Sequence, residues 1–379
     1  MNMSTDSNET TTSSSNELAI QFRICPIGEY QLDYGKLIKP VAEFRANIER
    51  FDVISKQATN YYNYYLAKSI AMKLASRKER AISFTELFEY DAGLIQSEDP
   101  ELKIASICLR IFENRDRLIN VKFDSDFLIS IFYWLQLIEG SDQFQDQNPF
   151  ATGQKGNIEI QPVPAGIMNL PFSVNLKSSI KELDDYLADE SEEPIIQALI
   201  AYLYLTIVSL NPEHKINNVG ISLFCQLFVY VKTGVLYPFS NIRHNAIRFD
   251  HVVKPDKTNY IIEAIGPVLQ DIDDLFDKQD LQELLFKNIK SHFKDKKQEK
   301  GAKIIDHIFA HPVFTLNDIL NFCDIPKPTA FRFISILKEK KLVVTLRKPE
   351  SNKSEILGLS LYFKHYINPS LTPTVVTNE

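Results

Sequence analysis

The chain has 379 residues, of which 44% are hydrophobic and 24% are charged, and its formal net charge is −7. This length allows two or more domains, because a single hydrophobic core stops growing at about 250–300 residues. The acidic total argues against a surface that binds nucleic acid everywhere, but it leaves room for one basic module.

Sequence features also bear on the compartment. The four cysteines lie far apart and form no CxxC pair, which is typical of buried thiols in a reducing environment. The Ser/Thr/Asn-rich segment 1–20 predicts a disordered tail and has neither the basic start nor the apolar centre of a signal peptide. No run approaches the roughly 20 apolar residues of a membrane span. We therefore expect a cytoplasmic protein without a membrane partner.

Helical periodicity dominates the first 140 residues. Apolar residues recur at helical spacing over Leu37–Lys78, where Pro40 suits a first turn. Ser83–Glu86 is a capping box that predicts the start of another helix, and Asp99 followed by proline predicts the next. Phe123–Glu139 has the pattern of a further amphipathic helix.

The middle of the chain changes from a loop-like to a helical pattern. Gly140–Pro171 is rich in Gln, Asn, Gly and Pro, and within it 157–163 alternates like a short edge strand. Helices are then predicted over Val174–Leu187, Ile195–Leu210 and Val219–Val231. The second of these is apolar almost all round, which predicts a central buried helix.

The chain after an acidic amphipathic stretch, Asp271–Leu285, has a separate organisation. Lysine-rich 287–300 reads as a connector. Predicted helices follow around Ile304–Phe309, over Leu316–Phe322 and over Ala330–Lys340, the last capped by Thr329, and predicted strands are Leu342–Leu346 and Ile356–Tyr362. Three helices followed by a two-stranded hairpin is the order of a winged helix-turn-helix.

The third of these C-terminal helices favours DNA as a partner. Phe331, Ile334 and Leu337 are expected to pack inward, which would leave a basic outer side. The candidate DNA-binding residues on the helix and wing are Lys327, Thr329, Arg332, Ser335, Lys338, Arg347, Lys348 and Lys353. The alternative is a module for protein contacts whose lysines are merely solvated.

Residues Asn211–Ser222 read N-P-E-H-K-I-N-N-V-G-I-S at the end of the buried helix pattern. The segment resembles the Fic (Fido) motif His-Pro-Phe-x-(Asp/Glu)-Gly-Asn-Gly-Arg-x-x-Arg, whose active members transfer AMP from ATP to protein hydroxyls. Only Pro212 and Asn217 match outright. The alternative reading is an ordinary helix–loop–helix junction in which Asn217 and Asn218 cap a helix.

The resemblance implies a dismantled site. Asn211 stands for the histidine base, and its amide cannot accept a proton near neutral pH. Lys215 stands for the acidic magnesium ligand, and Val219 and Ser222 stand for the two phosphate-clamping arginines. Asn218 replaces the second glycine. We therefore expect no catalytic residue, metal or cofactor, with ATP and Mg²⁺ bound only if the alternative of an active enzyme holds.

The resemblance extends to other segments. Ala75–Gly93 resembles the Ser-x-x-x-Glu-Gly helix and following stretch of Fic N-terminal regions, with Glu79 at the position of the inhibitory glutamate and Arg80 at that of the glycine. The strand at 157–163 falls where the family places a flap that holds target peptides. A winged helix after the core is a common arrangement in the family.

The expected fold class is mostly α: a Fic-like helical core with a short β-hairpin flap, then a winged helix. The predicted boundaries are a tail at 1–20, an N-terminal helical region at 21–120, a core at 121–286, the connector at 287–300, the winged helix at 301–368 and a tail at 369–379.

Three functions stay open at this point. The first is a catalytically deficient regulator that binds DNA, with homodimerisation as one option for its core. The second is an AMP transferase for Ser, Thr or Tyr hydroxyls with an atypical site. The third is a protein-interaction module that does not bind DNA.

Overall fold

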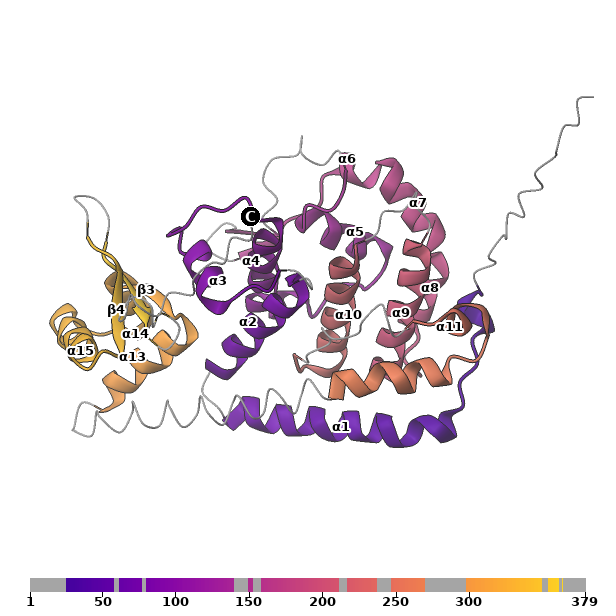
Figure 1. Cartoon of the computed structure of the whole chain (residues 1–379), viewed down its shortest axis with the longest axis horizontal. Helices are drawn as coiled ribbons and strands as arrows, with labels where there is room; N and C mark the ends of the chain where they lie inside the picture. The colour runs from indigo at the N-terminus through magenta and orange to yellow at the C-terminus, as the bar shows by residue number, and fades with distance from the viewer. Residues whose placement is uncertain are drawn as a thin grey trace, which may run out of the picture.

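The computed structural model describes residues 25–57, 61–76, 80–139, 149–152, 158–210, 217–236, 247–269, 298–349, 354–360 and 363. The prediction of a mostly helical chain is confirmed: helices fill most of these ranges, and the strands form one two-stranded and one three-stranded sheet. In these ranges, no helix combines the length and apolar character required to cross a bilayer. The C-terminal unit forms one end of the molecule (Figure 1).

The N-terminal region contains four α-helices where the sequence indicated helical periodicity. Leu37–Lys78 is divided into α1 (Tyr34–Gln57) and α2 (Tyr61–Ala75). Because α1 begins at Tyr34, Pro40 lies inside the helix, and its placement in a first turn was wrong. Next come α3 (Phe84–Asp91) and α4 (Pro100–Glu113). The capping boxes and caps explain these starts: Ser83 and Glu86 cap α3 reciprocally, and Asp99 accepts from two α4 backbone N–H groups.

The next elements surround the predicted loop region. Helix α5 is Ser125–Trp134, shorter at both ends than predicted. Strand β1 (Phe150–Thr152) pairs antiparallel with β2 (Ile158–Ile160), which lies inside the predicted strand at 157–163. Val174–Leu187, predicted as one helix, is two: α7 (Pro171–Ser179) and α8 (Lys181–Ala188), after the single turn α6 (Ala165–Met168).

Helices α9 (Pro194–Ser209) and α10 (Asn218–Thr233) form the centre of the core and pack extensively against each other. Every α9 residue from Ile195 to Val208 is buried, as the all-round apolar pattern predicts. Helix α10 also packs against α5 and α2. The short α11 (Phe249–Val253) and a helical stretch at 258–269 complete the described core.

Asp256 and the buried residue Lys257 connect the chain after α11 to Gln31, which precedes α1. Gln31 pairs with Asp256 in a parallel bridge, and the Lys257 backbone N–H donates to the Gln31 carbonyl at 3.0 Å. Lys257 Nζ, on a side chain that is fully buried, donates to the His251 and Lys254 carbonyls at 2.7 and 2.5 Å. His251 belongs to the last turn of α11 and Lys254 is its C-cap residue, so Lys257 supplies a donor to carbonyls that the helix itself does not satisfy.

The C-terminal unit follows the order α13 (Gln298–Ala310), β3 (Val313–Thr315), α14 (Leu316–Cys323), α15 (Lys327–Glu339), β4 (Val343–Arg347) and β5 (Ile356–Leu359). Its antiparallel sheet has the order β3-β5-β4, so the last strand is central. Thr315 and Asp318 form the capping box of α14. Helix α13 joins the unit to the core through α2 (Figure 1).

Three details of this unit correct the sequence predictions. A third strand, β3, joins the two predicted ones, because Val313–Thr315 is too short to leave a pattern of its own. Helix α15 begins at Lys327 after Pro326, so Thr329 is not its cap. Phe331 is 51% exposed rather than packed inward, and Phe333 is buried beside Ile334 and Leu337.

Candidate functional site

The first candidate site is the start of α10, which contains the end of the segment Asn211–Ser222. The side chain of Asn217 accepts a hydrogen bond from the Val219 N–H at 2.8 Å, so Asn217 is the N-cap and Asn218 is the first helical residue. Val219 is half-buried against the core, and Ser222 is buried at 8% exposure. Asn211 and Lys215 lie outside the described residues.

Gly220 holds this first turn close to α5. A Cβ at this position would lie 2.4 Å from the Phe132 ring, which is fully buried and packs edge-on against Phe172 at 5.8 Å. The lack of a side chain therefore sets the distance between the two helices. The first turn of α10 is thus packed and capped, and its residues Val219 and Ser222 carry no charge.

Arg80, one residue after Glu79, links two helix starts. Glu79 itself lies outside the described residues. The Arg80 guanidinium pairs with Glu86 at 2.6 Å and with Asp99 at 2.9 Å, and these are the capping residues of α3 and α4. Burial raises the pKa of Glu86 and of Asp99, but the hydrogen bonds from Arg80 and neighbouring groups outweigh it and lower both overall.

Substituting Arg80 by Met is expected to lower the free energy of unfolding by about 1 kcal/mol, the range of exposed ion pairs joined in a network. Because both carboxyl pKa values are lowered in the folded state, this contribution is present above their unfolded values and is lost as the pH falls through the folded ones. Urea unfolding at pH 7 and in the acid range measures it. An equal loss at both pH values would contradict the assigned pairs.

The β1–β2 hairpin lies in the segment where the sequence predicts a target-docking flap. Within the described ranges each strand pairs with the other alone, in the register Phe150 with Ile160 and Thr152 with Ile158. Phe150 is buried, which anchors the hairpin to the core. Gln161 N donates to the Pro149 carbonyl at 2.9 Å and extends the ladder by one pair. Such a hairpin could accept an added strand at an outer edge.

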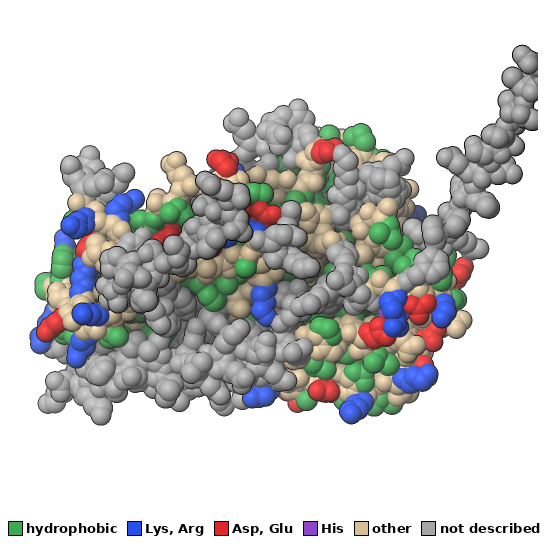
Figure 2. All heavy atoms as spheres, viewed as in Figure 1, with side chains coloured by type: hydrophobic (Ala, Val, Ile, Leu, Met, Phe, Trp, Pro, Cys, Tyr) green, Lys and Arg blue, Asp and Glu red, His purple; other side chains and the backbone are tan. Residues whose placement is uncertain are grey.

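The predicted DNA-binding residues divide into two groups. Lys327, Arg332, Ser335 and Lys348 are exposed, and Thr329 is half-buried. Lys338 pairs instead with Glu355 at 2.7 Å, and Thr345 donates to the same carboxylate oxygen at 2.7 Å. Arg347 is a half-buried residue of β4, and Lys353 lies outside the described residues. Figure 2 shows Lys and Arg side chains along the end formed by α15.

Lys338 therefore connects α15 to the sheet through Glu355, and its charge is paired and not available on the outer face of the helix. Burial raises the pKa of Glu355, but the bonds from Lys338 and Thr345 lower it overall. The exposed face still carries Lys327, Arg332 and Ser335, with Lys340 and Lys341 at the helix end.

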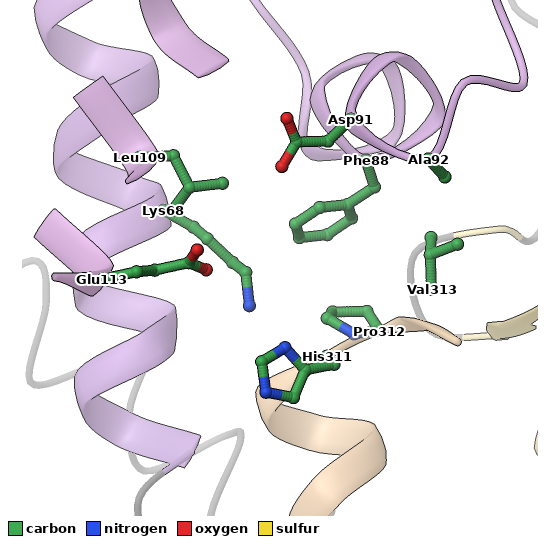
Figure 3. A pocket seen from close by; sticks show the side chains of 9 residues that line it. All are labelled: Lys68, Phe88, Asp91, Ala92, Leu109, Glu113, His311, Pro312 and Val313. Atoms are coloured by element: carbon green, nitrogen blue, oxygen red, sulfur yellow. The ribbon is translucent and has the colours of Figure 1, made fainter. Parts of the chain in front are cut away.

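Sequence reasoning missed a pocket of about 170 Å³ where the helical core meets the C-terminal unit. Its polar lining residues are Lys68 of α2, Asp91 of α3, Glu113 of α4 and His311, which follows α13 (Figure 3). Lys68 is 4% exposed on an otherwise apolar helix face, and this lysine among buried residues was the available signal. Nothing in the local pattern connects it with Glu113 or His311, because the fold alone brings them together.

The pocket changes the acidity of its groups. Burial lowers the pKa of Lys68 to about 8 against the attraction of Glu113 and Asp91. Burial also raises the pKa of Glu113. Burial lowers the pKa of His311 to about 4, and the nearby positive charge of Lys68 contributes to the same shift. At neutral pH the pocket thus holds a cationic lysine, two carboxyl groups and a neutral imidazole.

No protein-family model and no curated protein matches the chain. Among solved structures, the chain is similar to a Fic family protein from Desulfovibrio desulfuricans G20, with 13% sequence identity and a TM-score of 0.45. The similarity covers 87% of this chain and 97% of that chain.

Proposed function

We propose that this chain is a Fic-like protein without AMP-transfer activity that regulates by binding duplex DNA through its C-terminal unit. The Fic part rests on the resemblance of Asn211–Ser222 and of the Ala75–Gly93 segment. The loss of activity rests on chemistry: the base, metal-ligand and clamp positions carry Asn211, Lys215, Val219 and Ser222.

The observation that carries the DNA proposal is the two-sided character of α15. Phe333, Ile334 and Leu337 anchor its inner side, while Lys327, Arg332 and Ser335 are exposed on its outer side. A helix seated in this way can enter a major groove, where arginine recognises guanine edges and lysines contact phosphates. The order of helices and strands in the unit also suits a winged helix.

Arg332→Ala is expected to weaken binding to the preferred DNA site by about 1–3 kcal/mol, the usual value of a bidentate base contact. Because the preferred site is unknown, it is first selected from random duplexes with the full chain. Anisotropy titrations of the selected duplex and a scrambled one then separate lost specificity from lost affinity.

Lys348→Ala is expected to weaken binding to both duplexes alike and to flatten the dependence of log K on log salt concentration by about 0.9. Lys181→Ala, an exposed lysine of α8 on the helical core, is the matched control and should leave both curves unchanged. If the full chain shows no salt-dependent binding at low salt, the DNA proposal is wrong.

A second candidate function, a protein-interaction module, is favoured by two exposed aromatic residues of the same unit. Phe331 is 51% exposed on α15, and Phe322 is 72% exposed on α14. Exposed aromatic side chains are enriched at protein interfaces. This candidate predicts that Phe331→Ser removes a protein contact, whereas Arg332→Ala has little effect, so the same variants discriminate between the two functions.

A further inference from the structure

The pocket between the helical core and the C-terminal unit is large enough for a small organic molecule. Its volume is about 170 Å³, whereas one water needs about 10–15 Å³ on a comparable measure. Phe88 and Leu109 form an apolar part of the pocket wall, and four polar side chains also line the pocket. Figure 3 shows the Lys68 ammonium, the two carboxyl groups and the His311 ring turned toward one another across it.

Lys68 places a buried positive charge in this pocket. Its side chain is 4% exposed, and Nζ lies 5.3 Å from the centre of the Phe88 ring. Burying a charge is costly, so stability alone does not explain a lysine at this position. Buried charges that converge on a pocket are therefore candidates for ligand binding.

The two carboxyl groups retain acceptor capacity. Glu113 is half-buried, and no residue of the described ranges donates a hydrogen bond to it. Asp91 Oδ1 accepts from Ser106 Oγ at 2.5 Å and lies 3.6 Å from Arg110, but its Oδ2 accepts nothing from the same part of the chain. Half-buried carboxylate oxygens usually have a donor, from the protein, from water or from a ligand.

We propose that this pocket binds a small molecule that carries both an amino and a carboxyl group, of about the size of an amino acid. Its carboxylate pairs with Lys68, its ammonium lies between Glu113 and Asp91, and its apolar part contacts Phe88 and Leu109. A simple anion would meet two carboxyl groups, and a simple cation would meet Lys68, so only a ligand with both charges is matched.

The pocket is lined by residues of both units, so a bound ligand affects how the two units pack against each other. His311 comes from the C-terminal unit, whereas Lys68, Asp91 and Glu113 belong to the helical core. Because His311, Pro312 and Val313 also line the pocket, a ligand bound there lies against residues of both units and stabilises the packing of one unit on the other. An effect on DNA affinity rests on the proposed function, but ligand binding itself does not.

Binding is tested on the full chain with the twenty amino acids, by thermal unfolding and then by calorimetry. At least one is expected to raise the midpoint of unfolding. The N-acetyl and carboxamide forms of that amino acid each lack one charge and are expected to bind about 10- to 100-fold more weakly. If no amino acid binds, or if both blocked forms bind as well, the pocket holds water only and the proposal is wrong.

The double variant K68M/E113Q removes the Lys68 charge together with one of the two carboxylate charges that line the pocket, so the lysine is not lost alone. It is expected to unfold at a midpoint no lower than that of the wild type and to lose binding of the selected amino acid. Lys103→Met, which removes an α4 lysine that pairs with Glu98 at 2.5 Å, is the control and should retain binding. Retained binding in the double variant would overturn the site.

If the double variant does not fold, Glu113→Gln alone decides, because it keeps Lys68 and removes one charge. It should weaken binding of the amino acid but not of its carboxyl-only N-acetyl form. Equal weakening of both would overturn the assigned role of Glu113. A chain that binds the amino acid but no DNA would refute the proposed function and leave this site standing.

Discussion

Incubation with labelled ATP and magnesium is expected to leave both this protein and candidate protein substrates unmodified. Loss of a general base alone typically slows a reaction by about 10²–10⁴-fold, and under the proposed Fic resemblance the positions of the metal carboxylate and of both arginines carry Lys215, Val219 and Ser222. Modification that scales with the amount of protein and disappears in Asn217→Ala would contradict the inactive assignment. Because Asn217 caps α10, that variant should lose about 1 kcal/mol of stability but stay folded.

Asn211→His alone is not expected to restore AMP transfer, since groups that act as a unit are not additive in their effects. Restoring the second arginine meets a further obstacle. Ser222 is buried at 8% exposure, so Ser222→Arg requires room that the packed α9–α10 pair does not offer. Robust transfer by the single variant would show that the phosphate site is intact in a form the sequence does not reveal.

Gly220→Val is expected to destabilise the helical core by about 3 kcal/mol, the upper part of the usual range for overpacking a core. The added Cβ would lie 2.4 Å from the Phe132 ring, and that ring is fully buried and cannot swing away. Urea unfolding measures the loss. Combining it with Phe132→Leu should recover part of it, because neighbouring substitutions that relieve a shared clash are not additive.

Gly266→Val is the matched control, because Gly266 is also helical and a Cβ there would meet nothing within 4 Å. Its expected effect is within about 0.5 kcal/mol of zero. Equal losses in the two variants would mean that helix propensity, not the contact with Phe132, explains the result.

Local signals predicted the helix starts and the central buried helix. Ser83 with Glu86, Asp99 and Asn217 all cap helices, because a side-chain oxygen at the right spacing satisfies an N–H group whatever the tertiary fold. The apolar pattern of Ile195–Leu210 predicted a helix that is buried on all sides, and this segment forms the central helix α9.

The buried face of α15 follows from its helical periodicity. Phe331, Ile334 and Leu337 are spaced by three residues, whereas Ala330, Phe333, Ile334 and Leu337 follow the spacing of three and four that keeps one face of a helix together. The second set is the buried one. The position of Phe331 in the helical period lies off that face, and its side chain is 51% exposed.

The pocket could not be predicted from local patterns. Lys68, Glu113 and His311 are far apart in sequence, and each by itself looks like an ordinary polar residue of a helix or a helix end. The packing of both α4 and α13 against α2 brings them into one space. Their altered pKa values follow from burial in that space, which no window of sequence contains.

The position of β5 in the C-terminal sheet has a consequence for synthesis on the ribosome. Strands β3 and β4 each pair with β5, and among the described strands neither pairs with the other. As the polypeptide emerges, both must therefore wait for Ile356–Leu359 before their ladder can form. The helices from α1 to α10 are already available by then, so the core can assemble first and offer α2 as a surface on which the later unit docks. A nascent chain stalled before Ile356 would carry a finished core and an incomplete sheet.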